Sequence, residues 1–163
     1  MIGADLFQSG VNGIGLRSMK APGTAYDDPR LGKDPQPAHM DDFVTTTEDS
    51  GGVHINSGIP NRAFYLTATQ IGGNAYGDPG KIWYQALTSG RLSENATFAD
   101  FAQATRDAAT ELYGVDSSQL VAVTTAWQQV GVEPVQQTAE SADLMRAASL
   151  ALDHNRPPAP SPQ

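Results

Sequence analysis

The stretch TFADFAQATRDAATELYG, residues 97–114, indicates the fold more clearly than any other part of the chain. Small or apolar residues recur in it at the 3.6-residue period of an α-helix, at Phe98, Phe101, Ala102, Thr105, Ala108, Ala109 and Leu112. Thr97 and Asp100 have the spacing of a capping box, and Gly114 suits the end of a helix. The stretch therefore predicts a helix over residues 98–113, with one face packed on a core.

Helices of the same kind are predicted on both sides of it, over residues 57–71, 79–87 and 117–130. Pro60 would lie in the first turn of the first of these, where a missing N–H costs nothing. Asp78 is expected to cap the second, with a proline at its first position. The later part of the chain therefore predicts an all-α domain, a small helical bundle.

Both ends of the chain differ from this bundle. Residues 1–53 are punctuated by glycine and proline and keep no helical period, which predicts a long irregular segment. A loop of that length is usually functional or packs on another surface. Beyond Pro134, residues 139–153 predict a weak helix and residues 157–163 a proline-rich, disordered end.

Composition excludes several classes of function. The 163 residues suffice for one domain with its own core. Asp and Glu number 18 against 10 Lys and Arg, a net charge of -8, which argues against a nucleic-acid partner. No apolar run approaches the length of a membrane-spanning helix, and residues 1–5 lack the basic and apolar regions of a signal peptide. Without cysteine, and with three histidines at no ligand spacing, the chain predicts no metal site of its own.

The strongest chemical signal is EDSGGVHINSG, residues 48–58. Gly51 and Gly52 permit a tight backbone path, and Asp49 precedes His54 by five residues. An aspartate so placed can orient the imidazole, and a charged histidine is a good donor to an oxyanion. The alternative, which local chemistry alone favours, is a histidine at the start of a helix that binds loop carbonyls.

Charged loop residues give weaker signals. Arg17 lies among few other basic residues, where its guanidinium could bind a substrate carbonyl or carboxylate. On the residues alone, a solvated arginine or one that ties down its own loop is the favoured alternative. The pairs Asp27–Asp28 and Asp41–Asp42 are interpreted as solvated caps in preference to calcium ligands.

Taken together, these residues resemble the C-terminal part of the thermolysin-like zinc metalloendopeptidases, the M4 peptidases. The resemblance runs over about residues 2–132 and rests on motifs in the family's order and spacing: Leu16–Met19, Asp49 with Gly51–Gly58, Gly80–Leu87 and Ala108–Gly114. The Gly51–Gly58 string is the most specific of them, and residues 36–40 and 59–65 look most like the protealysin-type branch. The resemblance implies a helical, substrate-facing domain over residues 1–132, with residues 133–163 as an extra tail.

The resemblance also implies roles for four residues. His54 matches the histidine that stabilises the tetrahedral oxyanion of the attacked peptide, and Asp49 matches the acidic residue that supports it. Arg17 matches the arginine that hydrogen-bonds the substrate carbonyl next to the scissile bond. Leu16 matches a wall residue of the apolar primed-side pocket. Peptides or proteins are the implied substrates.

The chain departs from the family in its metal ligands. The H-E-x-x-H helix and the downstream glutamate ligand are absent and would be expected upstream of Met1. Zinc is thus implied as the cofactor of a complete enzyme, bound by a missing N-terminal half, and this chain alone is predicted to be inactive. Ala4 and Ile14 stand where some relatives have calcium ligands, so no calcium ligand is carried over.

Two other functions stay open from the sequence. One is a non-catalytic module that binds peptides or a protease, which an exposed apolar face would favour. The other is an inactive, truncated fragment. The compartment is open as well, either secreted or cytoplasmic.

Overall fold

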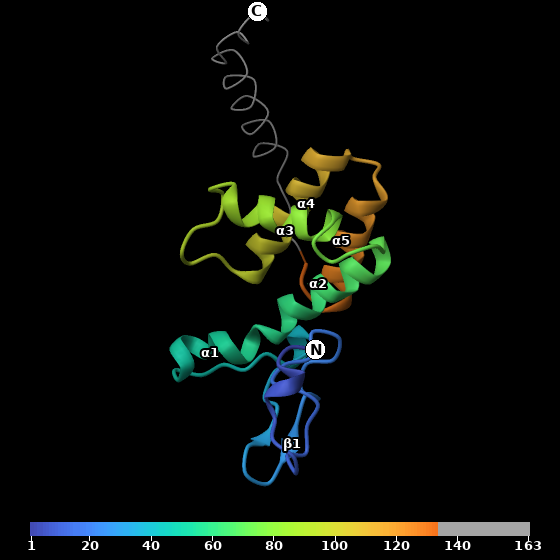
Figure 1. Ribbon diagram of the computed structural model, residues 1–163. Coiled ribbons are helices and arrows are strands. Elements are labelled where there is room, and N and C mark those ends of the chain that lie inside the picture. The colour runs from blue at the N-terminus through green and yellow to red at the C-terminus, as the bar shows by residue number, and fades with distance from the viewer. Residues whose placement is uncertain (134–163) are drawn as a thin grey trace, which may run out of the picture.

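A computed structural model describes residues 1–133, and this part of the chain is mostly helical (Figure 1). Its elements in chain order are the 3-10 helix η1 (Ala4–Leu6), the strands β1 (Asp27–Asp28) and β2 (Gly32–Lys33), the 3-10 helix η2 (Met40–Asp42), and the helices α1 (Asp49–Asn56), α2 (Gly58–Ile71), α3 (Asp78–Thr88), α4 (Phe98–Tyr113) and α5 (Ser118–Gln129). The predicted fold class, an all-α bundle after a loop-rich segment, is confirmed.

Four of the helices pack around one core. Helix α2 lies against α5, and α4 packs on both α3 and α5. The largest fully buried apolar side chains come from three of these helices and from the residue after α5: Trp127, Ile59, Ile82, Val123 and Val130. Trp83 stacks on Trp127 with 6.2 Å between the ring centroids. Because burial of apolar surface contributes about 25 cal/mol per Å², this core is the main source of stability.

The helix boundaries follow the sequence closely where capping is local. At the start of α4, Thr97 Oγ1 accepts the Asp100 N–H at 3.2 Å and Asp100 Oδ2 accepts the Thr97 N–H at 2.8 Å, which is the predicted capping box. The predicted cap of α3 is wrong, because Gly77 is the cap and Asp78 is the first helical residue. The Asp78 carboxylate instead accepts a hydrogen bond from Gln119 of α5 at 3.0 Å, a tertiary partner that local sequence does not reveal.

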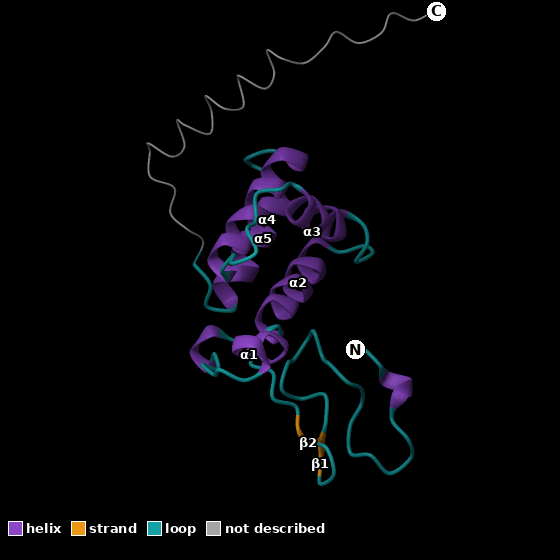
Figure 2. Cartoon of the chain, turned by 90° about the vertical axis from the view of Figure 1, so that its left-hand side faces the viewer, coloured by secondary structure: helices purple, strands orange, loops and turns teal. Residues whose placement is uncertain are grey.

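The N-terminal third is irregular, as predicted, up to residue 48. Strands β1 and β2 form a short antiparallel hairpin that pairs Asp27 with Lys33. This hairpin and the loops around it lie beyond α1 as seen from the bundle (Figure 2). Helix α1 begins at Asp49, whereas the sequence predicted a first helix near Ser57. Ser50, Gly51 and Gly52 in α1 have non-helical backbone angles, so this helix is irregular at its start.

Two further predictions concern the C-terminal residues and membranes. The weak helix over residues 139–153 and the proline-rich end lie outside the described residues. Within residues 1–133, no helix has both the length and the apolar character that crossing a bilayer requires.

Candidate active site

The turn that opens α1 has left-handed backbone at four consecutive residues. The angle φ is 54° at Asp49, 51° at Ser50, 84° at Gly51 and 78° at Gly52. Glycine adopts such angles freely, whereas a non-glycine residue there costs about 1–2 kcal/mol. Backbone strain of this kind clusters at functional sites and persists only where other contacts hold it. Here the Asp49 side chain makes those contacts.

The Asp49 carboxylate binds both the side chain and the backbone of His54. One oxygen lies 2.6 Å from His54 Nδ1, and the other accepts the N–H groups of His54 at 2.9 Å and Ile55 at 3.2 Å. Because an ionised carboxylate only accepts, Nδ1 carries the hydrogen in this contact. The hydrogen bond with the imidazole lowers the pKa of the Asp49 carboxyl; burial opposes the shift, and the backbone N–H groups add to it.

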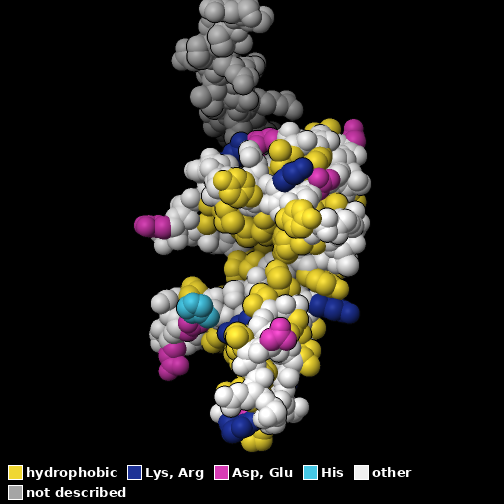
Figure 3. Space-filling model, in the orientation of Figure 1, with side chains coloured by type: hydrophobic (Ala, Val, Ile, Leu, Met, Phe, Trp, Pro, Cys, Tyr) yellow, Lys and Arg dark blue, Asp and Glu magenta, His cyan; other side chains and the backbone are white. Residues whose placement is uncertain are grey.

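The imidazole of this pair is open to solvent. The His54 side chain is 82% exposed, while that of Asp49 is 25% exposed. Figure 3 shows histidine and acidic side chains next to one another over α1, at the edge of the molecule. With Nδ1 held by Asp49, Nε2 is the nitrogen left for an external group. The arrangement can therefore present one oriented N–H donor to a bound molecule.

The backbone of His54 is held from the opposite side of the turn. Gln36, which is buried, donates from its side-chain amide to the His54 carbonyl at 2.9 Å and to Ser57 Oγ at 2.8 Å. The Ser57 hydroxyl donates to the same carbonyl at 2.8 Å. Sequence reasoning assigned Gln36 no role, although it lies in the 36–40 stretch that marked the protealysin-type resemblance.

Leu16 and Arg17 lie on a separate strand-like segment. The Ile2 N–H donates to the Arg17 carbonyl at 2.8 Å, and the Leu16 N–H donates to the Ile2 carbonyl at 2.9 Å. Arg17 Nη1 donates to the Leu16 carbonyl at 2.7 Å, and the residue is half-buried. Among the hydrogen bonds and ion pairs within residues 1–133, none joins this segment to Asp49 or His54. The structure thus brings Asp49 and His54 into direct contact and shows no direct polar contact of Arg17 or Leu16 with this pair within residues 1–133.

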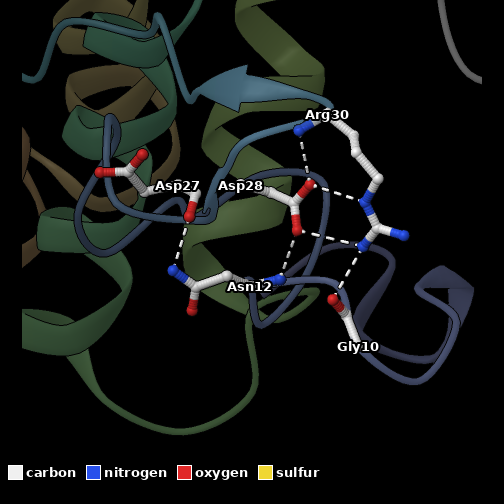
Figure 4. A network of polar contacts seen from close by, with 5 residues as sticks. All are labelled: Gly10, Asn12, Asp27, Asp28 and Arg30. Carbon is white, nitrogen blue, oxygen red and sulfur yellow. Dashed lines mark hydrogen bonds and ion pairs between the residues drawn. The ribbon is translucent and has the colours of Figure 1, made fainter.

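A buried carboxylate, that of Asp28, ties together the loops around residues 10–30 (Figure 4). Asp28 is only 3% exposed and accepts hydrogen bonds from Asn12 N at 2.8 Å, from Arg30 N at 2.9 Å and from the Arg30 guanidinium. Arg30 also donates to the Gly10 carbonyl at 2.8 Å. The Arg30 side chain holds the pKa of Asp28 far below its usual value, and the Asn12 backbone N–H adds to this effect. The expectation of a solvated pair at Asp27–Asp28 is therefore wrong for Asp28, because Asn12, 16 residues away, and the nearby Arg30 bind its carboxylate.

An apolar groove of about 720 Å³ lies between α1, the start of α4 and the residues that follow α5. Its larger apolar lining residues are Met40, Phe43, Val53, Pro60, Phe98 and Val132. Figure 3 shows the surface hollowed between α1 and the bundle, with hydrophobic side chains gathered above. Such a groove has the size and the lining of a site for an apolar side chain or segment.

Comparison with known proteins decides the family. A family model described as the α-helical domain of thermolysin metallopeptidases matches residues 1–132. The chain belongs to this family. The resemblance to the C-terminal part of M4 metallopeptidases is thereby confirmed, together with the helical fold class that it implied.

Individual thermolysin-like relatives share about half of the aligned residues. An extracellular metalloprotease of Pectobacterium carotovorum subsp. carotovorum is 50% identical over 133 residues, which cover 82% of this chain and 38% of that protein. An extracellular elastase of Staphylococcus epidermidis is 43% identical over 132 residues, covering 81% and 23%. The precursor of protealysin, a metalloproteinase from Serratia proteamaculans, matches in structure with a TM-score of 0.78 at 57% identity, over 81% of this chain and 40% of that chain. This chain thus spans less than half the length of these relatives.

Metallopeptidases need a metal, and the described residues do not fit one. Within residues 1–133, no three His, Asp or Glu side chains come together as a metal site. His54 is engaged by Asp49, and His39 Nδ1 accepts the Asp41 N–H at 3.1 Å while its ring packs over Gly131. No set of zinc ligands is therefore assigned within residues 1–133.

Proposed function

We propose that this chain is the C-terminal, substrate-facing part of a zinc-dependent metalloendopeptidase and that His54, oriented by Asp49, stabilises the oxyanion of the attacked peptide. The observation that carries the proposal is the 2.6 Å contact between Asp49 Oδ1 and His54 Nδ1 at a strained, left-handed turn. Membership of the thermolysin metallopeptidase family supports it, since peptide-bond hydrolysis is the chemistry that such a donor would serve.

The chemistry of the pair follows from where charge develops. As the peptide carbonyl becomes tetrahedral, its oxygen gains negative charge. When the His54 imidazole is protonated, Nδ1–H donates to Asp49 and Nε2–H is free to donate to that oxygen. A donor fixed in advance costs no reorganisation as the charge appears, which makes this type of stabilisation a large part of catalysis.

Arg17 and Leu16 are proposed to bind the substrate. Arg17 is half-buried, and within residues 1–133 its guanidinium makes one hydrogen bond, to the Leu16 carbonyl, which leaves further donors for a substrate carbonyl. Leu16 is 39% exposed and packs by Gly3, which suits a wall of an apolar pocket. The proposed partners are accordingly a peptide or protein substrate and an N-terminal half that supplies the zinc ligands.

The complete protease would be larger than this chain. The relatives extend well beyond the matched segment. Two carry the words extracellular and metalloprotease in their names and a third is named an extracellular elastase, which supports a secreted hydrolase. An antibody against residues 1–132 tests this in the source cells. A species much longer than 163 residues is expected, and a species of only this length would favour the fragment or binding-module alternatives.

The catalytic proposal is tested by adding the missing half. The 163-residue chain is joined behind the N-terminal remainder of the Pectobacterium carotovorum relative, and hydrolysis of a fluorogenic peptide is measured. His54→Ala should lower kcat about 10²–10³-fold, as loss of one oxyanion donor does elsewhere. His39→Ala, which removes a histidine that packs over Gly131, is the matched control and should retain activity.

Three results contradict the proposal: an inactive parent fusion, a fully active His54→Ala fusion, or chelator-sensitive hydrolysis by the unfused chain with added Zn²⁺. The last would mean that the chain supplies zinc ligands itself.

One observation favours a second candidate function, a module that binds peptides without hydrolysing them. The apolar groove between α1 and α4 is formed by this chain alone and needs no N-terminal half. Such a module should bind apolar peptides with equal affinity before and after His54→Ala, which calorimetry on the unfused chain would measure.

A further inference from the structure

Gln36 is a buried polar residue that the proposed chemistry does not use. It is 4% exposed, and its amide nitrogen donates to the His54 carbonyl and to Ser57 Oγ. These two acceptors flank the last turn of α1, the turn that carries the imidazole. Burying an amide costs free energy unless its hydrogen bonds are made, so an apolar side chain would fill this position at a lower desolvation cost.

The amide is not needed to satisfy the His54 carbonyl. Ser57 Oγ donates to that carbonyl at 2.8 Å, so the oxygen would keep a partner without Gln36. A methionine of similar length would fill the same volume. The amide additionally fixes the orientation of the turn, since its one nitrogen binds both the His54 carbonyl and the Ser57 hydroxyl.

The segment that carries Gln36 is itself held firmly. The Asp34 carboxylate, 3% exposed, accepts the Gln36 N–H at 3.2 Å together with the N–H groups of Gly23 at 3.1 Å and Ala25 at 3.2 Å. On the other side, a Cβ added at Gly58 would lie 2.4 Å from the Pro37 carbonyl oxygen. Only glycine permits this approach of α2 to the segment, which is therefore packed with little slack.

The same hydrogen bonds lead back towards Arg17. Ala25, which donates to Asp34, accepts the Ile14 N–H at 2.8 Å, and Ile14 lies three residues before Arg17. A series of hydrogen bonds thus connects the Arg17 segment, the Asp34 loop and the His54 turn. Asp49 holds the imidazole of His54 from one side, and Gln36 holds its backbone from the other.

We propose that Gln36 is a positioning residue, which sets the orientation of the His54 imidazole relative to the Arg17 segment by fixing the His54 carbonyl. This inference rests on the catalytic role proposed for His54. Gln36 touches neither substrate nor reacting atoms, and it acts through the turn alone.

The test replaces the amide with an apolar side chain of the same length. In the fusion with the N-terminal half, Gln36→Met should lower kcat about ten- to a hundredfold, the range expected for misplacement by a fraction of an ångström to 1 Å, with KM changed less than about twofold. In the 163-residue chain, the pKa of Asp49, followed by carboxyl ¹³C NMR, should rise towards its usual value, because the imidazole no longer stays in place to donate to it.

A matched control separates positioning from stability. Gln119→Met makes the same substitution at a glutamine that donates to Asp78 between α5 and α3, in the bundle. It should cost stability without changing kcat or the pKa of Asp49. Ser57→Ala removes one acceptor of the Gln36 amide with a smaller change in volume, and it should lower kcat in the same direction if Gln36→Met does not fold.

The outcomes distinguish the two proposals. A fully active His54→Ala fusion overturns the role of His54 and the role of Gln36 with it. If His54→Ala loses activity, the role of His54 stands. The Gln36 inference alone is then overturned when Gln36→Met, or Ser57→Ala in its place, keeps the parent kcat and the lowered pKa of Asp49.

Discussion

Asp49 holds His54 at two points, with one carboxylate oxygen 2.6 Å from Nδ1 and the other 2.9 Å from the backbone nitrogen. The imidazole and the chain that carries it are therefore fixed by the same group. That group sits in a left-handed turn whose angles only glycine adopts without cost. The strain of the turn and the orientation of the histidine thus depend on one carboxylate.

Asp49→Asn should preserve the shape of this contact and weaken it. An amide offers one acceptor oxygen where the carboxylate offers two, so the amide NH₂ would face either the imidazole Nδ1–H or the backbone N–H groups. In the fusion protease we expect kcat to fall about ten- to a hundredfold, less than on His54→Ala, because the donor remains but is held loosely.

Asp41→Asn is the matched control for that substitution. Asp41 also lies beside a histidine, 3.2 Å from His39 Nδ1, but it is almost fully exposed. Its kcat should equal that of the parent. Equal kcat for Asp49→Asn and the parent would show that the carboxylate does not orient the active imidazole.

The lowered pKa of Asp28 predicts that the folded chain loses stability in acid. Its pKa is lowered in the folded chain by Arg30 and Asn12, so the folded state binds its proton less readily than the unfolded state does. The resulting stabilisation is present above the unfolded carboxyl pKa, about 3.9, and is lost as pH falls through and below that value. Asp28→Asn should lower the Tm at pH 7 and leave a smaller difference from the parent at pH 2–3.

Asp27→Asn provides the comparison for this series. Asp27 is the exposed neighbour in β1, and Asn12 binds its backbone carbonyl, which the substitution keeps. Its Tm should follow that of the parent at each pH. Parallel Tm curves for Asp28→Asn and the parent, from pH 7 to pH 2, would contradict the lowered pKa of Asp28 in the folded chain.

How far the sequence predicts this structure depends on how local each interaction is. The capping box of Thr97 and Asp100 lies within four residues, and α4 begins and ends where the sequence predicts. Leu112 fits the period yet is 43% exposed, although Tyr113 beside it packs on the core. The bundle is therefore predictable from period and caps, to within a residue or so at most ends.

The remaining differences arise from contacts between distant residues. Asn12 donates to the Asp28 carboxylate from 16 residues away, and Gln119 donates to the Asp78 carboxylate from 41 residues away. Gln36 lies 18 residues from His54, and no spacing rule links them. Of the candidate site, the sequence predicted the Asp49–His54 contact, because the two residues are only five apart.

A buried hydrogen bond in the core gives a prediction about stability. Thr105 Oγ1 accepts the Trp127 indole N–H at 2.8 Å and donates to the Ala102 carbonyl at 2.8 Å, and both side chains are fully buried. Thr105→Val keeps the shape but leaves the indole N–H without a partner, which should cost about 1–3 kcal/mol of unfolding free energy in urea titrations.

Thr105→Ser separates the hydroxyl from the methyl group. Serine keeps the acceptor and loses a methyl group, worth about 0.8 kcal/mol of burial. The indole proton should therefore stay protected from exchange in the serine variant and become unprotected in the valine variant. Equal protection in both variants would show that the Trp127–Thr105 bond does not hold in solution.

Thr67 presents the opposite case, a hydroxyl whose removal should help. It is fully buried in α2, and its Oγ1 has no hydrogen-bond partner among the residues that the structure describes. Thr67→Val exchanges the hydroxyl for a methyl group of similar size at nearly equal helix propensity. Because an unpaired buried hydroxyl carries its full desolvation cost, we expect the free energy of unfolding to rise by about 1 kcal/mol.

Thr69→Val in the same helix is the control, since the exposed Thr69 hydroxyl donates to the Tyr65 carbonyl, and this variant should change stability by less than about 0.5 kcal/mol. A destabilised Thr67→Val would mean that the hydroxyl is bound in solution, with a buried water as the simplest partner.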